Sequence, residues 1–168
     1  DNYQPRYVVG TVYRKLADNR DKALANSFGP WDPNEFTVED SAFGFVVMKN
    51  GATIFLESSW ALNTLDVGEG KTTLCGALGG ADIRDGLRIN DQKYGRHFVE
   101  TPLLGAARVD FYQGEAVSPG EMEARVFYDA ILKGTPLVVE AAQALVVTEI
   151  LEAVYQAAAT GKPVFFEE

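Results

Sequence analysis

The chain has 168 residues, of which 46% are hydrophobic and 23% charged, and this composition predicts one globular domain with a single buried core. Its formal net charge of -9 argues against DNA, RNA and anionic membrane surfaces as partners, because such partners select clustered lysine and arginine. No apolar run reaches the roughly 18 to 20 residues that a membrane span needs, so we expect no membrane-spanning segment.

The single cysteine, Cys75, excludes an intrachain disulfide and favours a reducing compartment, so we expect a cytoplasmic protein. The cysteine itself is expected to be a small buried residue of a strand. The chain opens with DNYQPRYVVG, which lacks an initiator methionine and enters a predicted strand almost at once. We therefore expect it to be part of a longer protein.

Strand patterns dominate the first half of the chain. Residues 6–15 (RYVVGTVYRK) predict a first strand, and the long irregular segment 16–37, which contains two X-Pro pairs, predicts a loop that could form a lid or rim. Asn50-Gly51 lies between two β-rich runs, which is typical of a tight hairpin. The hairpin strands are expected over residues 39–49 and 52–61, followed by four or more short strands.

The predicted hairpin has apolar residues on both faces. Phe43, Phe45 and Val47 alternate onto one face, while Ala42, Val46 and Met48 lie on the other. A hairpin with one face in water would be polar on that side. We therefore expect helices on one face and, most simply, a second copy of the same sheet on the other, which predicts a homo-oligomer.

Helical periodicity begins at Ser118. Ser118 as N-cap, Pro119 at the first helical position and Glu121 predict a helix over 119–133 that ends at Gly134. A second helix is predicted over 140–160, with a short edge strand in the closing PVFFEE. Strands first and helices last predict an α+β fold: an open, mostly antiparallel mixed sheet with two C-terminal helices packed on one face.

Several motifs resemble functional signatures but lack their spacing. VGEGKTT at 67–73 lacks the leading glycine of a phosphate loop, and GALGGAD at 76–82 lacks the dinucleotide spacing, so positive φ at Gly79 or Gly80 in a turn explains it. His97 is the only histidine, which favours a strand-end or half-buried role over a zinc ligand or a catalytic base. Glu39 and Asp40 are adjacent on a strand and point to opposite faces, so they form no paired-carboxylate site.

Four segments, at residues 10–16, 38–63, 72–83 and 144–164, resemble in this order parts of one known domain. It is the C-terminal domain of the Gfo/Idh/MocA oxidoreductases, the glucose-fructose oxidoreductase and inositol dehydrogenase family. Residues 38–63 resemble its paired central strands and residues 10–16 its first sheet strand. TTLCGALGGADI at 72–83 resembles its TTxxGxxGGA segment, and residues 144–164 resemble its closing helix and tail. The resemblance covers essentially the whole chain.

This resemblance implies that the chain, residues 1–168, is one substrate-side and oligomerisation domain of a two-domain enzyme. An N-terminal Rossmann domain, absent from this chain, would bind NAD or NADP and carry the family's Glu-Lys-Pro lysine. The family's catalytic histidine and aspartate would precede the first strand, so Lys71, Lys162 and His97 take none of these roles. We expect no catalytic residue and no cofactor in this chain, and no activity from it alone.

Five residues are candidates for contacts with a sugar, inositol or related polyol. Tyr13, Arg14 and Lys15 end the first strand, where donors could meet hydroxyls, although a solvated strand end explains them equally well. Trp31 and Asp32 lie in the long loop, where an indole could stack on a sugar ring or pin the loop to the core.

Two further residues are expected to be structural. Trp60 is assigned to packing rather than to the cleft, and Glu57, if buried, would need a partner such as Arg14. The function predicted is therefore the C-terminal domain of an NAD(P)-dependent sugar or polyol oxidoreductase. The alternatives are a purely non-catalytic assembly domain and a stand-alone carbohydrate-binding β-domain.

Overall fold

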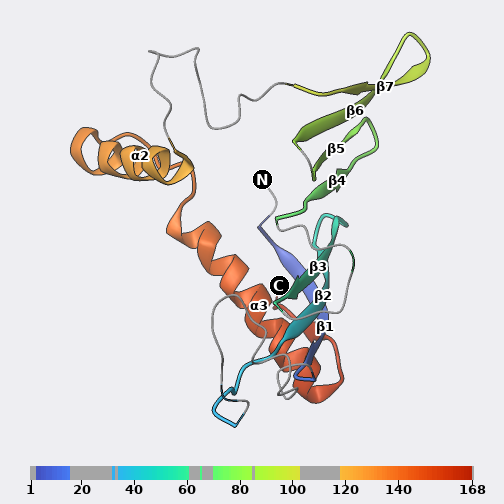
Figure 1. Cartoon of the computed structure of the whole chain (residues 1–168), viewed down its shortest axis with the longest axis vertical. Helices are drawn as coiled ribbons and strands as arrows, with labels where there is room; N and C mark the ends of the chain where they lie inside the picture. The colour runs from blue at the N-terminus through green and yellow to red at the C-terminus, as the bar shows by residue number, and fades with distance from the viewer. Residues whose placement is uncertain are drawn as a thin grey trace. The chain divides into compact units, whose positions relative to one another are not determined.

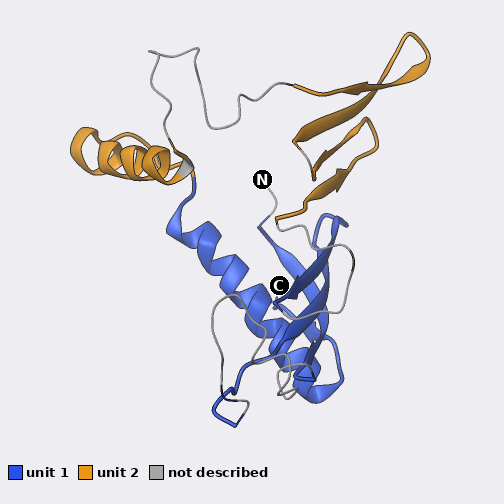
Figure 2. Ribbon diagram, in the orientation of Figure 1, with its two compact units in different colours: residues 1–63, 139–168 blue, residues 64–138 orange. Residues whose placement is uncertain are grey.

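The computed structural model describes residues 3–15, 32, 34–60, 65, 70–84, 86–102 and 118–167. The chain divides into two compact units, one formed by residues 1–63 and 139–168 and the other by residues 64–138 (Figure 2). Each unit is described by itself.

The first unit contains a four-stranded antiparallel sheet (Figure 1). Its strands are β1 (Pro5–Tyr13), β2 (Ser41–Met48), β3 (Thr53–Ser59) and β8 (Val164–Phe165), in the order β3-β2-β1-β8. The predicted hairpin is confirmed as β2 and β3, with Gly51 at φ 89° and the Asn50 side chain accepting a 2.9 Å bond from the Ala52 N–H. The closing segment pairs with β1 at the sheet edge, as predicted.

Helix α3 (Ala141–Thr160) covers one face of this sheet (Figure 1). It ends at Gly161, whose φ of 66° is the left-handed conformation that favours glycine. Its buried residues Ile150, Ala153 and Val154 form the core together with Val8 and Val46 of the sheet. The helix-facing half of the predicted two-sided hairpin is therefore confirmed.

Two glycines allow α3 to approach the sheet closely. Gly10 and Gly44 lie opposite each other on β1 and β2, and both face Val154. A Cβ at Gly10 would lie 2.7 Å from Val154 Cγ1, and a Cβ at Gly44 would lie 3.1 Å from Val154 Cγ2. The absence of side chains at these two glycines thus leaves the space that the Val154 side chain occupies.

The opposite face of the sheet carries aromatic side chains. Phe45 and Phe55 lie directly opposite on β2 and β3, with ring centroids 5.1 Å apart, and Tyr7 and Phe165 pack at 5.5 Å. Phe55 is 79% exposed within this chain. Both faces of the sheet are therefore apolar, as the sequence pattern predicts.

In its described residues, the second unit contains another four-stranded antiparallel sheet and one helix. The strands β4 (Thr73–Cys75), β5 (Gly80–Ile83), β6 (Leu87–Lys93) and β7 (Arg96–Glu100) follow one another in chain order. Helix α2 (Pro119–Lys133) has the predicted bounds and caps: Ser118 Oγ accepts a 3.2 Å bond from the Glu121 N–H, and Gly134 has φ 66°.

The α+β class and the open antiparallel sheet architecture are confirmed, and every strand pair in the described residues is antiparallel. The strands form two sheets in these residues. Of the two predicted helices, α3 packs on the first sheet as expected, while α2 belongs to the second unit.

Two predictions, the burial of Cys75 and the positive φ at Gly79 or Gly80, are wrong. Cys75 is in a strand but is exposed, because β4 is a three-residue strand at one end of the sheet and pairs on one side only. Gly79 and Gly80 do not have positive φ; instead, a Cβ at Gly79 would lie 2.6 Å from the Asn90 carbonyl oxygen, and one at Gly80 would lie 2.8 Å from that of Leu74. Close backbone approach explains these glycines.

Across the described residues, no helix combines the length and apolar character that crossing a bilayer requires.

Candidate functional site

The predicted Tyr13-Arg14-Lys15 segment lies at the end of β1. Tyr13 is the last residue of the strand, and its half-exposed ring packs edge-on against Phe43 at 6.1 Å. Arg14 is partly buried and Lys15 is exposed. We call these three residues the rim. The rim presents a phenol and two cations, which are hydrogen-bond donors suited to hydroxyl or carboxylate groups.

Asp40 fixes the backbone of the rim and is itself 2% exposed. Its carboxylate accepts bonds from the Lys15 backbone N–H at 2.5 Å and from Ser41 Oγ at 2.9 Å. Its backbone N–H donates to the Tyr13 carbonyl at 2.8 Å. The Asp40 carbonyl in turn accepts bonds from Ser59 Oγ at 2.8 Å and from the Trp60 N–H at 3.2 Å. One buried residue therefore ties together the ends of β1, β2 and β3.

Glu39, the neighbour of Asp40, bonds to the helix instead. The Tyr155 hydroxyl of α3 donates to Glu39 Oε1 at 2.5 Å. This hydrogen bond, with smaller contributions from burial and from the negative charge of Glu39, raises the pKa of the Tyr155 phenol. Glu39 and Asp40 thus have separate partners, which agrees with the prediction that they form no carboxylate pair.

Trp60 packs beside this junction. Its indole Nε1 donates to the Glu39 carbonyl at 2.9 Å, and its ring lies 4.9 Å from that of Phe36. This geometry agrees with the packing role predicted for it. Glu57 is exposed on β3, so its carboxylate does not need the partner that a buried charge would require.

Asp32 bonds within its own turn. Its carboxylate accepts bonds from the Asn34 backbone N–H at 2.8 Å and from Asn34 Nδ2 at 2.9 Å, and its carbonyl accepts from Glu35 and Phe36. This is an Asx-type turn, which connects to the rim region through the ring contact of Phe36 with Trp60. Trp31, the other loop candidate, lies outside the described residues.

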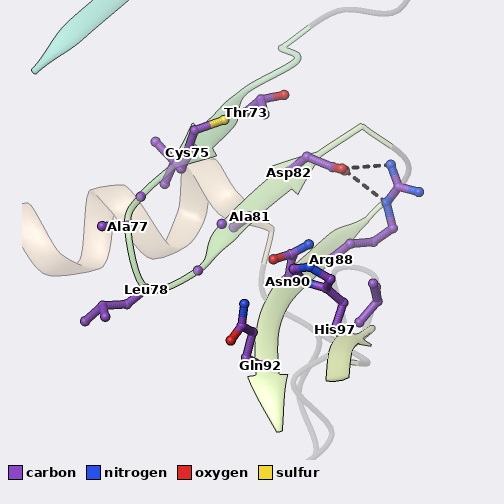
Figure 3. Close-up of a pocket in the computed structure, with 15 residues that line it drawn as sticks. Thr73, Cys75, Ala77, Leu78, Ala81, Asp82, Arg88, Asn90, Gln92 and His97 are labelled. Atoms are coloured by element: carbon purple, nitrogen blue, oxygen red, sulfur yellow. Dashed lines mark hydrogen bonds and ion pairs between the residues drawn. The ribbon is translucent and has the colours of Figure 1, made fainter. Parts of the chain in front are cut away.

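The second unit has a concave surface of its own. It has a volume of about 460 Å³ and lies over one face of β4–β7 and the 76–80 turn (Figure 3). Asp82 and Arg88 form a two-point ion pair there, and His97, Asn90 and Gln92 line the same surface. His97 is exposed near the start of β7, so the predicted strand-end position is confirmed.

Within the described residues, no group of three or more His, Cys, Asp or Glu side chains could hold a metal ion. The glycine turn at 76–80 leads into strand β5 rather than into a helix, so it provides no helix N-terminus for a pyrophosphate.

Sequence reasoning missed Asp40 and Tyr155. The sequence signal for Asp40 was weak: an aspartate followed by serine at the start of an apolar strand is typical of a local hydrogen-bonded cap. The partner of Tyr155 is 116 residues away, and no local pattern indicates such a pair.

No family model matches the chain. A D-glucoside 3-dehydrogenase of Escherichia coli K12 is 28% identical over 135 residues, which cover 80% of this chain and 35% of that protein. The chain therefore spans about a third of the length of this curated relative.

Solved structures match nearly the whole chain. An aldose-aldose oxidoreductase from Caulobacter crescentus, complexed with glycerol, matches 97% of this chain and 42% of its own, with a TM-score of 0.65 at 18% identity. An oxidoreductase domain protein from Kribbella flavida matches 98% and 45%, with a TM-score of 0.69 at 16% identity. An Agrobacterium radiobacter oxidoreductase in complex with NAD+, L-tartaric acid and magnesium matches 96% and 43%, with a TM-score of 0.62 at 18% identity.

In each structure the match takes up less than half of the larger chain. These matches show that the chain has the fold of a part of these oxidoreductases, and they agree with the resemblance of its four sequence segments to the Gfo/Idh/MocA oxidoreductases.

Proposed function

We propose that this chain is the substrate-side and assembly domain of a cytoplasmic NAD(P)-dependent oxidoreductase that acts on a sugar, inositol or related polyol. An N-terminal Rossmann domain of the whole protein would bind NAD or NADP. The cofactor would accept or donate a hydride at a substrate carbinol carbon, while this domain positions the substrate. The isolated chain would be inactive.

The observation that carries this proposal is the pattern of coverage. The Escherichia coli D-glucoside 3-dehydrogenase aligns with 80% of this chain, yet the chain spans 35% of that enzyme. The remaining length of such an enzyme leaves room for a nucleotide-binding domain, and the Agrobacterium radiobacter structure, which contains NAD+, supports a nicotinamide cofactor for the whole protein.

The rim is the proposed substrate contact of this domain. Asp40 holds its backbone through the bonds to Tyr13 and Lys15, so the rim side chains start from a fixed strand end. A fixed backbone removes one part of the conformational entropy that these side chains would otherwise lose when they bind a hydroxyl. Trp31 and Asp32 are proposed as further contacts from the loop.

The whole protein tests this proposal by reduction of NAD+ or NADP+ with D-glucosides, D-glucose and myo-inositol, followed at 340 nm. We expect turnover with at least one substrate, and Arg14→Ala is expected to raise KM about 2- to 10-fold, which corresponds to one lost hydrogen bond of about 0.5–1.5 kcal/mol.

The matched control is Arg6→Ala, at the opposite end of the same strand, which should leave KM unchanged. Equal effects of Arg14→Ala and Arg6→Ala on KM would show that the rim does not contact the substrate. A whole protein that reduces neither nucleotide with any of these substrates would contradict the proposed reaction.

The aromatic face of the first sheet is the proposed homo-oligomer contact. Phe55 is 79% exposed there and packs against the partly buried Phe45, and exposed apolar surfaces on soluble domains mark interaction sites. We expect Phe55→Glu to convert a dimer to a monomer in light scattering, because it places a charge on the proposed apolar contact.

Tyr94→Glu, at a fully exposed turn of the second unit, is the control and should leave the mass unchanged. A wild-type chain that stays monomeric at high concentration would contradict the oligomer proposal. The same aromatic face is what favours the alternative of a purely assembly domain, for which Arg14→Ala would leave KM unaltered in an active whole protein.

A further inference from the structure

The second sheet has one strongly polar face. Strand pairing places Thr73 opposite Asp82, Asp82 opposite Arg88, and Gln92 opposite His97, so side chains of four strands point the same way. The alternate residues of these strands point to the opposite face, where the side chains are Leu74, Ala81, Ile89 and Phe98. The polar face is the floor of the concave surface in Figure 3.

The charges on this face cancel. Arg88 Nε donates to Asp82 Oδ1 at 3.0 Å and Arg88 Nη2 donates to Asp82 Oδ2 at 2.8 Å, which is a two-point pair between opposite charges. The surface therefore offers polar groups without a net field that would select an anion or a cation.

Hydrogen-bonding capacity remains on the same floor. In the part of the chain that the structure describes, the side chains of Asn90, Gln92 and His97 have no hydrogen-bond partner. Each amide offers both donors and acceptors, and a neutral imidazole offers one of each. Asn90 and Gln92 are two residues apart on β6, so they are about 7 Å apart along the strand.

The turn at 76–80 forms a wall beside this floor. Gly79 and Gly80 bring the backbone against the Asn90 and Leu74 carbonyl oxygens, closer than any side chain would allow. Leu78 at the tip of the turn is 92% exposed, and Val99 adds apolar surface on β7. The volume of about 460 Å³ is within the roughly 300–1,000 Å³ range of small-molecule sites.

We propose that this concave face of β4–β7 binds a neutral polyhydroxylated ligand of monosaccharide size. Hydroxyls would bond to the free amide and imidazole groups and to the outer edges of the Asp82–Arg88 pair, while the C–H surface of the ligand would lie against Leu78 and Val99. Charge balance and free hydrogen-bonding groups carry this inference; the choice of a sugar among neutral ligands rests on the proposed function.

Cys75 provides a built-in reporter. It is the single cysteine of the chain, it is exposed, and it lines the same concave surface. A ligand seated there would slow its reaction with the thiol reagent 5,5′-dithiobis(2-nitrobenzoate). We expect saturating D-glucose or myo-inositol to slow the reaction of the full chain several-fold, and sulfate at the same concentration to leave the rate unchanged.

Two variants and a matched control locate the ligand. His97→Ala and Gln92→Ala should each raise the half-protecting sugar concentration about 2- to 10-fold, as expected for one lost hydrogen bond. Arg96→Ala, next to His97 on the same strand but on the opposite face, should not change it. Protection that is absent for both polyols, equal for sulfate, or equally weakened by Arg96→Ala would overturn the proposal.

The assay separates this inference from the proposed function. Protection of Cys75 in a protein that reduces neither NAD+ nor NADP+ would leave the concave surface supported and contradict the oxidoreductase proposal. An active whole protein whose Cys75 is not protected by any polyol would support the oxidoreductase proposal and contradict ligand binding at the concave surface.

Discussion

Asp40 is the residue on which the rim depends. It is buried, and its carboxylate accepts bonds from the Lys15 backbone N–H and the Ser41 hydroxyl. Asp40→Ala would leave the buried Ser41 hydroxyl and the part-buried Lys15 N–H without this acceptor, so we expect the free energy of unfolding to fall by about 1–3 kcal/mol. Asp40→Asn keeps one carbonyl oxygen and should lose less. Urea denaturation followed by circular dichroism measures both.

Asp129→Ala is the control for removing a carboxylate. Asp129 forms an i,i+4 ion pair with Lys133 on the surface of α2, and such a pair contributes about 0.3–0.5 kcal/mol. An Asp40→Ala variant as stable as Asp129→Ala would show that Asp40 does not hold the strand ends together.

For single residues, the sequence predicts hydrogen bonds between near neighbours in the chain but not those between residues far apart in the chain. The cap of α2 could be predicted because Ser118 and Glu121 are three residues apart. The burial of Asp40 could not, because it arises only where three strands end together. The exposure of Cys75 was missed for a related reason: the number of neighbours of a strand is set by the sheet, not by the strand's own residues.

At the scale of elements, the fit between α3 and the first sheet rests on a glycine pair. We expect Gly10→Ala to lower the free energy of unfolding by about 1–3 kcal/mol, because its Cβ would lie 2.7 Å from Val154 Cγ1 in a packed core. Val154→Ala in the same chain should recover part of this loss, and only part, since the new Cβ also lies 3.1 Å from the Val154 backbone. A double-mutant cycle in urea measures the coupling.

Gly120→Ala provides the comparison, because a Cβ there meets nothing within 4 Å and alanine favours the helix. It should be neutral or stabilising. If Gly10→Ala also leaves the free energy of unfolding unchanged, α3 can shift away from the sheet without loss of stability. Gly10 and Gly44 would then not be needed for the packing of α3 on the sheet.

The helices and the hairpin could be predicted as elements because their signals are local. Asn50-Gly51 and the period-two apolar pattern predict β2 and β3, and Gly134 and Gly161 end the helices where expected. The role of Gly10 could not be predicted in this way, because a glycine inside a strand pattern has no partner until the helix is placed.

At the scale of the whole molecule, the two-sided apolar hairpin predicts that both sheet faces need a cover. The structure shows α3 on one face, and the aromatic face with Phe45 and Phe55 is the proposed contact with a second copy. The sequence does not predict the concave surface of the second unit, because GALGGAD and His97 are distant in the chain and only strand pairing brings them to one surface.

The central proposal is that this chain positions the substrate, while another domain of the whole protein binds the nicotinamide cofactor. The most direct measurement is a titration of NADH fluorescence with the whole protein and, separately, with the chain of residues 1–168. We predict enhancement at micromolar affinity for the whole protein and none for the isolated chain. Enhancement by the isolated chain at micromolar affinity, or its absence from the whole protein with both NADH and NADPH, would contradict the account.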